Sequence, residues 1–350
     1  MTILIYITLG IITAYISFHF LLHKNSLTQL KKTNDKGERW ASQKKPIIGG
    51  IGFYILFIYS YIFYLIYTDF HITNSNEFIT LLIVSSLGFF SGLFDDIKGS
   101  TPRLKLIIQI IIGLIVILSG NHINSFSTDW INYPITLFWF VALMNSINML
   151  DNMDAITTSV SATIIASLVV IEMYMTKQFS SISFISIGVF ISLILFLKWN
   201  WNPSKMYMGD NGSQFLGAFI AFAGIKILWN NNVNHISEFP IKEIIAVAFA
   251  FIVMISDTAT VTINRLRAGK SPFIGGRDHT THHLSYLGLT ERQVALTLIS
   301  ISILANIATF FVICISRDMV VWQSILWLVI AFLIFGCLYS TTIFGKPKNL

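Results

Sequence analysis

Long apolar stretches, separated by short polar segments, recur from one end of the chain to the other. Each stretch has about 18 residues or more, enough for a helix to cross the ~30 Å hydrocarbon core of a bilayer with its backbone hydrogen bonds satisfied. We therefore predict an all-α integral membrane protein, a bundle of about 10–11 transmembrane helices. The predicted spans are residues 2–23, 46–67, 77–94, 104–120, 133–150, 158–176, 181–198, 213–230, 241–263, 294–316 and 320–343.

The composition agrees with this prediction. Of the 350 residues, 54% are hydrophobic and only 11% are charged, against about 25% charged in an average soluble domain. A surface that faces lipid removes the need for charge, whereas a large soluble core does not. The first apolar stretch is too long for a signal-peptide core and follows no basic segment, so we expect a retained helix. Cys314 and Cys337 lie within apolar stretches and suggest no disulfide framework.

Basic residues divide the connecting segments into two alternating sets. Nineteen of the 23 Lys and Arg residues lie in or beside one set, which the positive-inside rule makes cytoplasmic. An odd number of spans then puts the N-terminus outside and the C-terminus in the cytoplasm. The net charge of +6 suits anionic substrates or lipids, and no nucleic-acid motif is present. The predicted cytoplasmic loops are about 24–45, 95–103, 151–157, 199–212 and 264–293, within one polytopic domain over residues 1–350.

Acidic residues gather at the predicted cytoplasmic helix ends. A carboxylate at a membrane boundary is costly unless it is paired, bound to a metal or turned toward a polar cavity. Asp95 and Asp96 are adjacent, and Arg103 and Lys105 follow within a turn or two. Such a group suits a hard cation such as Mg²⁺ with phosphate oxygens, and paired carboxylates can also provide a base. Solvated loop charges are the alternative for any one of these residues.

Two further polar segments end or begin predicted spans. Asn148, Asp151 and Asp154 recur every three residues, which puts three oxygen-bearing side chains on one side of the helix if it continues. A helix-capping segment is the alternative. The segment 208–213 places Asp210 between glycines directly before a span, where the backbone can approach an anion and the helix N-terminus favours phosphate. A plain N-cap role for Asp210 is the alternative there.

The longest predicted cytoplasmic loop is basic and rich in histidine. Arg265 begins it, and His279, His282 and His283 share one face if that segment is helical. Three histidines could bind zinc, but no cysteine is near, and arginine with histidine more readily binds a phosphate or diphosphate. A basic loop resting on lipid headgroups is the alternative. Lys45 ends the first cytoplasmic loop at headgroup depth.

Taken together, these segments resemble the polyprenyl-phosphate N-acetylhexosamine-1-phosphate transferases (glycosyltransferase family 4). That family includes the undecaprenyl-phosphate N-acetylglucosamine-1-phosphate transferases and the related phospho-MurNAc-pentapeptide transferase. The matches run in the family's order from about residue 44 to residue 287. They are Pro-x-x-Gly-Gly at 46–50, Gly-Leu-Phe-Asp-Asp at 92–96, Lys105 and Gln109 on the next helix, Asn200, and Met-Gly-Asp-x-Gly-Ser-x-x-Leu-Gly at 208–217, the most specific piece.

Two segments depart from the family's pattern. Where the family usually has Asn-x-x-Asp-Gly-x-Asp-Gly-Leu, Asn152 and Ala155 replace both glycines, while Asp151 and Asp154 remain. The family's His-x-His-His motif reads Asp-His-Thr-Thr-His-His at 278–283, one residue longer. We expect retained chemistry with a different local backbone.

The resemblance implies transfer of an N-acetylhexosamine-1-phosphate from a UDP-sugar to polyprenyl (undecaprenyl) phosphate, with release of UMP. This would be the first membrane step of a cell-envelope polysaccharide such as O-antigen, capsule or teichoic acid. The resemblance also implies a multi-pass protein of the inner (plasma) membrane with a cytoplasmic active site, Mg²⁺ or Mn²⁺ as cofactor, and it allows a homodimer. It implies Asp95 and Asp96 as catalytic residues, Asp210, Asn148 and Asp151 as metal ligands, and Lys45, Lys105, Asp154, Asn200, Arg265, His279, His282 and His283 as substrate-binding residues.

Two other functions stay open from the residues alone. An intramembrane prenyltransferase also uses Asp-rich motifs and Mg²⁺, but it would want two spaced Asp-x-x-x-Asp motifs and gives no reason for the histidine loop. A secondary transporter would carry ionisable residues or broken helices near the membrane midplane, and pseudo-repeated halves. Here the charges gather at one face, and only Glu172 and Lys226 lie well inside the predicted spans.

Overall fold

The computed structural model describes residues 2–23, 45–69, 75–231, 239–271, 276–316 and 319–345. These residues form helices and no strand beyond one isolated bridge between Ile47 and Tyr207, which confirms the predicted all-α class. The helices are α1 (Thr2–His23), α2 (Gly49–Tyr67), α3 (Ser75–Lys98), α4 (Pro102–Leu118), α5 (Asp129–Leu150), α6 (Ile156–Thr176), α7 (Ser181–Asn200), α8 (Gly209–Gly224) with its π-helical extension η1 (Ile225–Trp229), α9 (Ile241–Ala250), α10 (Ile252–Arg267), α11 (Thr280–Tyr286), α12 (Glu291–Phe310) with its π-helical extension η2 (Phe311–Ile315), and α13 (Val321–Phe344).

Most of the predicted spans have a matching helix. In the described part of the chain, nine helices are long and apolar enough to cross a membrane: α1, α2, α3, α5, α6, α7, α8 with η1, α12 with η2, and α13. The bent pair of α9 and α10 raises the number to ten when it is counted as one span. The predicted span 104–120 corresponds to α4, whose 17 residues reach about 26 Å, slightly less than the hydrocarbon thickness.

The prediction of one continuous helical span over 241–263 is wrong. The chain breaks at Phe251, where α9 and α10 meet at 81°. The Phe251 ring is fully buried and packs edge-on against Trp139 of α5, with 5.1 Å between ring centroids. Asn306 of α12 donates a hydrogen bond to the Ala250 carbonyl at 3.4 Å. Hydropathy does not reveal the break, because the two halves taken together are apolar and neighbouring side chains bind the freed carbonyl.

Helix α8 is the centre of the bundle. Its residues are all buried except Asp210, and α2, α3 and α5 pack along it. Small residues let membrane helices approach closely. A Cβ on Gly92 of α3 would lie 2.1 Å from the Asp210 carbonyl oxygen, so the two backbones touch there. This contact fixes the last turns of α3 against the first turn of α8.

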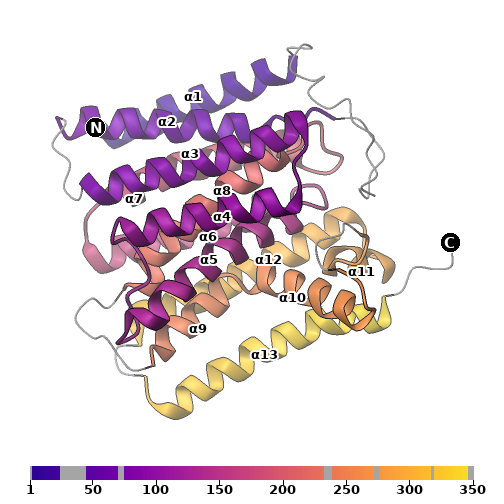
Figure 1. Ribbon diagram of the computed structural model, residues 1–350. Coiled ribbons are helices and arrows are strands. Elements are labelled where there is room, and N and C mark those ends of the chain that lie inside the picture. The colour runs from indigo at the N-terminus through magenta and orange to yellow at the C-terminus, as the bar shows by residue number, and fades with distance from the viewer. Residues whose placement is uncertain are drawn as a thin grey trace.

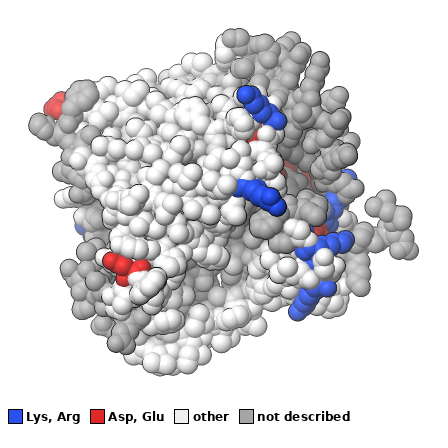
Figure 2. All heavy atoms as spheres, viewed as in Figure 1, with Lys and Arg blue, Asp and Glu red and all other residues white. Residues whose placement is uncertain are grey.

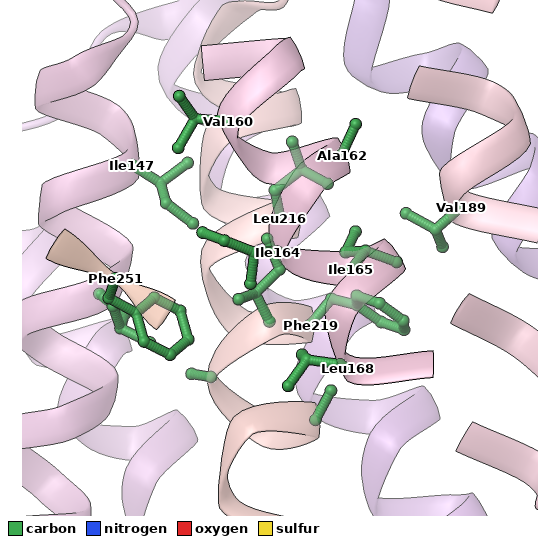
Figure 3. Close-up of a cluster of buried hydrophobic side chains, with 14 of the residues drawn as sticks. Ile147, Val160, Ala162, Ile164, Ile165, Leu168, Val189, Leu216, Phe219 and Phe251 are labelled. Carbon is green, nitrogen blue, oxygen red and sulfur yellow. The ribbon is translucent and has the colours of Figure 1, made fainter. Parts of the chain in front are cut away.

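Apolar side chains fill the bundle around α8. Figure 3 shows Leu216 and Phe219 of α8 among side chains of α6, including Ile164 and Leu168, with Phe251 from the α9–α10 break nearby. All five are buried. Because lipid tails are as apolar as these side chains, such contacts stabilise the bundle through close packing.

The two ends of the bundle differ in charge. Helix α1 begins at the left-hand end in Figure 1, whereas α13 ends at the right-hand end beside α11. Most of the Lys and Arg side chains visible in Figure 2 lie toward this right-hand end, and the broad surface between the ends is largely uncharged. The surface is therefore suited to lipid in the middle and to water at the ends.

Candidate active site

Four helices bring charged and amide side chains together at the right-hand end of the bundle. The Lys105 Nζ lies 2.7 Å from an Asp95 carboxylate oxygen and 2.6 Å from an Asp210 carboxylate oxygen. The Asn148 amide donates to the other Asp210 oxygen at 3.0 Å. We call these residues the carboxylate cluster: Asp95 in the last turn of α3, Lys105 in the first turn of α4, Asn148 in the last turn of α5 and Asp210 in the first turn of α8.

A tight connection between α3 and α4 places Lys105. The Thr101 hydroxyl caps α4 by accepting the Leu104 N–H at 3.3 Å. Pro102 follows at the start of the helix, where its missing N–H costs nothing. Because the chain turns back within residues 99–101, the first turn of α4 lies beside the last turn of α3.

Asp96 has different partners from those of its neighbour Asp95. Its carboxylate accepts the Asp210 N–H at 3.2 Å and the Asn211 N–H at 2.9 Å, and it is buried. A carboxylate at a helix N-terminus satisfies otherwise unpaired N–H groups and complements the helix dipole. Gly209 makes this approach possible, because its φ of +80° suits glycine and a Cβ there would lie 2.9 Å from an Asp96 oxygen. Asp96 thus holds the first turn of α8 in place.

A chain of amides ties three helices together next to the cluster. Asn145 donates to the Gln109 side-chain oxygen at 2.7 Å, and Gln109 donates to Gln214 at 3.2 Å. The three residues belong to α5, α4 and α8. Of the three, only Gln109 matches the family's sequence pattern. Helical spacing could have found the other two, because Asn145 lies one turn before Asn148 and Gln214 one turn after Asp210.

The row of Asn148, Asp151 and Asp154 required the helix to continue, and it does not form because α5 ends at Leu150. The capping segment given as the alternative is what the structure has. Asp151 is the C-cap, with φ −76° and ψ 49°, and Asp154 lies in the following turn. The Asp154 carboxylate instead accepts the Ser204 hydroxyl at 2.7 Å and the Ser204 N–H at 2.9 Å. The structure therefore brings Asn148 into the carboxylate cluster and places Asp154 against the loop between α7 and α8.

That loop, residues 201–208, contacts two more of the predicted site residues, Lys45 and Asn200. The Lys45 Nζ donates to the Ser204 hydroxyl at 3.0 Å and lies 3.9 Å from an Asp154 oxygen. The buried Asn200 side chain accepts the Ala155 N–H at 3.1 Å and donates to a loop carbonyl at 3.0 Å. Ser204, which sequence reasoning missed, is the shared partner of Lys45 and Asp154. Its isolated position in the sequence gave no signal.

The three predicted histidines lie close together but do not form one row. His279 precedes α11 and its Nδ1 donates to Asp257 of α10 at 2.8 Å, while the other Asp257 oxygen accepts the Thr280 N–H at 2.8 Å. The His279 N–H donates to the His282 Nδ1 at 3.3 Å. Burial lowers the pKa of His282 to about 3, helped by the neighbouring His279. The His283 Nδ1 contacts the Gly345 carbonyl oxygen at 2.6 Å.

Arg265 forms a two-pronged ion pair with Asp278. Its Nε and Nη2 donate to the two Asp278 oxygens at 2.7 Å and 2.6 Å, and its side chain is 7% exposed. Partial burial raises the pKa of Asp278, but the hydrogen bonds and positive charge of Arg265 outweigh this and hold that pKa below its usual value. The predicted phosphate-binding arginine is thus engaged in fixing the segment before α11.

The oxygens around Lys105 also fit a divalent cation. The carboxylates of Asp95 and Asp210, from separate helices, both face the position of the Lys105 ammonium group. Carboxylate oxygens are hard ligands, which suit Mg²⁺. No group of three or more His, Cys, Asp or Glu residues among the described ones could hold a metal ion. Two carboxylates suffice for Mg²⁺ when substrate phosphates and water supply the other ligands.

The family model for glycosyl transferase family 4 matches residues 78–228, the part that carries the carboxylate cluster. A helical membrane bundle with this cluster therefore belongs to the class of membrane transferases. The chain is a member of glycosyl transferase family 4.

Relatives of two kinds support the family assignment. A phospho-N-acetylmuramoyl-pentapeptide-transferase of Staphylococcus saprophyticus is 31% identical over 274 residues, which are 71% of this chain and 79% of the relative. Another, of Staphylococcus epidermidis, is 32% identical over 232 residues, 59% of this chain and 67% of the relative. A probable undecaprenyl-phosphate N-acetylglucosaminyl 1-phosphate transferase of Bacillus subtilis is 25% identical over 289 residues, 80% of this chain and 75% of the relative.

Proposed function

We propose that this protein transfers an N-acetylhexosamine-1-phosphate from a UDP-sugar to undecaprenyl phosphate and releases UMP, as the first membrane step of a cell-envelope polysaccharide. The observation that carries the proposal is the carboxylate cluster at one end of an otherwise apolar bundle. A lipid phosphate is held at headgroup depth by its tail, and a nucleotide arrives from water, so both anions can meet there. The names of the relatives supply the undecaprenyl phosphate acceptor and the phosphorylated N-acetylhexosamine, and the family resemblance supplies UDP as its carrier.

The reaction joins two anions, so positive charge must offset their repulsion. Mg²⁺ would be held by Asp210 and Asn148, with Asp95 beside them and Asp151 from the adjoining turn, and it would neutralise the phosphates. Mn²⁺ has similar ligand preferences. Lys105, which lies between Asp95 and Asp210, would bind the lipid phosphate.

We assign the transfer itself to the lipid phosphate as nucleophile. Asp95 orients this phosphate and takes its proton if it arrives protonated. A phosphate oxygen then forms a bond to the sugar-side phosphorus, and the bond from that phosphorus to the bridging oxygen breaks. The electron pair leaves with UMP. Asp96 serves this step by holding the helix that carries Asp210.

The remaining predicted residues shape the donor site. Asp154 and Asn200 would position the loop 201–208 against the nucleotide, and Lys45 would bind phosphate at headgroup depth. The histidines and Arg265 would hold the diphosphate and the sugar, with Arg265 acting through the segment that it fixes. The N-terminus would lie outside the cell and the C-terminus in the cytoplasm, with the cluster facing the cytoplasm at the inner membrane.

The α9–α10 break is a feature that a secondary transporter would share. It is packed by apolar rings, however, and its freed Ala250 carbonyl is bonded to Asn306. Lys226, one of the two ionisable residues that lie well inside the predicted spans, pairs with Glu77 at 3.0 Å. The other, Glu172, accepts the Ser183 hydroxyl. These contacts pair Lys226, Glu172 and the Ala250 carbonyl without a transported ion.

The test is UMP release by the purified protein with undecaprenyl phosphate, Mg²⁺ and a panel of UDP-sugars. The panel includes UDP-N-acetylglucosamine, UDP-N-acetylgalactosamine and UDP-MurNAc-pentapeptide. We expect activity with an N-acetylhexosamine donor, and losses of roughly 100-fold or more in Asp95→Asn and Asp210→Ala. Asp95→Asn removes the base that takes the proton of the lipid phosphate, and Asp210→Ala removes the carboxylate that would hold Mg²⁺. Asp129→Asn, a matched change of an exposed carboxylate at the other end of the bundle, should keep full activity.

Two outcomes would contradict the proposal. Full activity in Asp95→Asn and Asp210→Ala would show that neither carboxylate has the catalytic or metal-binding role assigned to it. Uptake of substrate into proteoliposomes without UMP release would favour the transporter.

A further inference from the structure

Helix α13 is the most exposed of the candidate membrane spans, with 17% of its apolar stretch buried. It packs along α9 and α10, and its C-terminal end meets α11 (Figure 1). Near that end the Tyr339 hydroxyl accepts a hydrogen bond from Arg267 at 2.6 Å and donates one to Asn264 at 3.1 Å. Polar contacts therefore fasten the last turns of α13 to the last turns of α10.

The residue after α13, Gly345, contacts His283 of α11, which we call the histidine helix. The Gly345 carbonyl oxygen lies 2.6 Å from the His283 Nδ1. A carbonyl oxygen only accepts hydrogen bonds, so the proton of a neutral His283 must be on Nδ1. The Nε2 atom then carries the lone pair, and proton exchange takes place there.

Only glycine fits at position 345 without a shift of the backbone. A Cβ on residue 345 would lie 2.4 Å from the His283 carbonyl oxygen and 2.8 Å from the Thr341 carbonyl oxygen. Neither atom belongs to a flexible side chain, so a larger residue must move the end of α13 away from α11. Gly336, two turns earlier on the same helix, has open space where its Cβ would be.

We infer that α13 is a positioning element of the active site: its Gly345 carbonyl fixes the ring orientation and tautomer of His283, so that Nε2 is the atom presented to the bound diphosphate or sugar. This inference rests on the proposed function, because it gives His283 a substrate to face. Gly345 and Tyr339 are positioning residues, which act through His283 and touch no substrate.

The test compares two identical substitutions on one helix. We expect Gly345→Ala to lower kcat/KM for the UDP-sugar by about 2- to 12-fold, the value of one oriented hydrogen bond, while Gly336→Ala leaves it unchanged. Tyr339→Phe keeps the ring and removes both hydrogen bonds of the hydroxyl, so it should also lower kcat/KM. This milder substitution tests the inference if Gly345→Ala does not fold.

A second comparison separates positioning from a merely structural role. In His283→Gln the side chain has an amide near the Nε2 position and no donor at the Nδ1 position. Gly345→Ala should therefore cause no further loss of kcat/KM in a His283→Gln background. If the losses of kcat/KM from Gly345→Ala and His283→Gln multiply in the double variant, the inference is overturned. It is also overturned if Gly345→Ala and Tyr339→Phe both have the kcat/KM of the wild type. A wild-type protein that releases no UMP with any donor overturns the proposed function itself and the inference with it.

Discussion

Adjacent aspartates of this protein have unlike partners. Asp95 faces the ammonium group of Lys105, whereas Asp96 accepts backbone N–H groups of α8. Adjacent helical residues point about 100° apart, so two neighbouring carboxylates at a helix end reach different surroundings. The histidines follow the same rule, since His279, His282 and His283 each use Nδ1 for a different partner. One of them, His282, has a measurable consequence for stability.

The buried His282 predicts how stability depends on pH. An unfolded histidine has a pKa of about 6.5, and burial lowers that of His282 to about 3. Between these values the unfolded chain binds a proton that the folded protein does not, so the free energy of unfolding falls as the pH drops from about 6.5 toward 3. We expect His282→Gln to flatten this part of the Tm-versus-pH curve, measured on detergent-purified protein. The control is His19→Gln on the exposed α1, and an unchanged slope in His282→Gln would contradict the prediction.

At the scale of elements, one hydrogen bond joins the turn after α5 to the histidine helix. The Thr281 hydroxyl donates to the Asn152 side-chain oxygen at 2.6 Å, and the Asn152 amide donates to the Met149 carbonyl at 2.9 Å. Asn152 lies between Asp151 and Asp154. Both residues belong to segments that depart from the family's sequence pattern, so this contact joins the two departures.

Breaking this link should loosen α11 relative to the α5–α6 turn. We expect Thr281→Val to lower kcat about tenfold and Tm by a few degrees, because it leaves the Asn152 oxygen without its donor. Thr280→Val is the matched control, since the neighbouring Thr280 hydroxyl is also buried but has no hydrogen-bond partner among the described residues. UMP release and thermal unfolding of both variants check the prediction. Equal effects of the two substitutions would sink it.

The sequence predicts which helices exist far better than where they break. Hydropathy locates the spans because each crosses the same apolar thickness. The break at Phe251 is invisible to it, since the side chains that satisfy the freed carbonyl, such as Asn306, come from a distant helix. The end of α5 at Leu150, by contrast, agrees with the end of the predicted span 133–150. Residue types of the site were predictable, while their partners, such as Ser204 for Asp154, depend on a loop conformation that no local pattern encodes.

At the scale of the whole molecule, the charged groups divide between the two ends. The carboxylate cluster lies at one end, and Asp129 at the other end begins α5 with its side chain 59% exposed. Lys98 is exposed at the cluster end, in the last turn of α3. These two residues can report which end faces the cytoplasm.

Cysteine labelling tests the proposed orientation. In a background with Cys314→Ser and Cys337→Ser, we expect Asp129→Cys to react with a membrane-impermeant thiol reagent in intact cells. Lys98→Cys should react only after permeabilisation, because the positive-inside rule puts its end in the cytoplasm. The reverse pattern would invert the topology and leave the carboxylate cluster without access to cytosolic nucleotide.

The enclosure of α8 limits how a family of such proteins can diversify. Asp210 is the one residue of that helix which is not buried, and its backbone is in contact with that of α3. Because its backbone is fixed, the Asp210 carboxylate cannot shift to suit a larger or smaller donor. Donors of different size must therefore be accommodated by the segments around it. Changes of sugar preference should accordingly be sought in the loop 201–208 and in the approach to α11, with the α3–α8 pair left untouched.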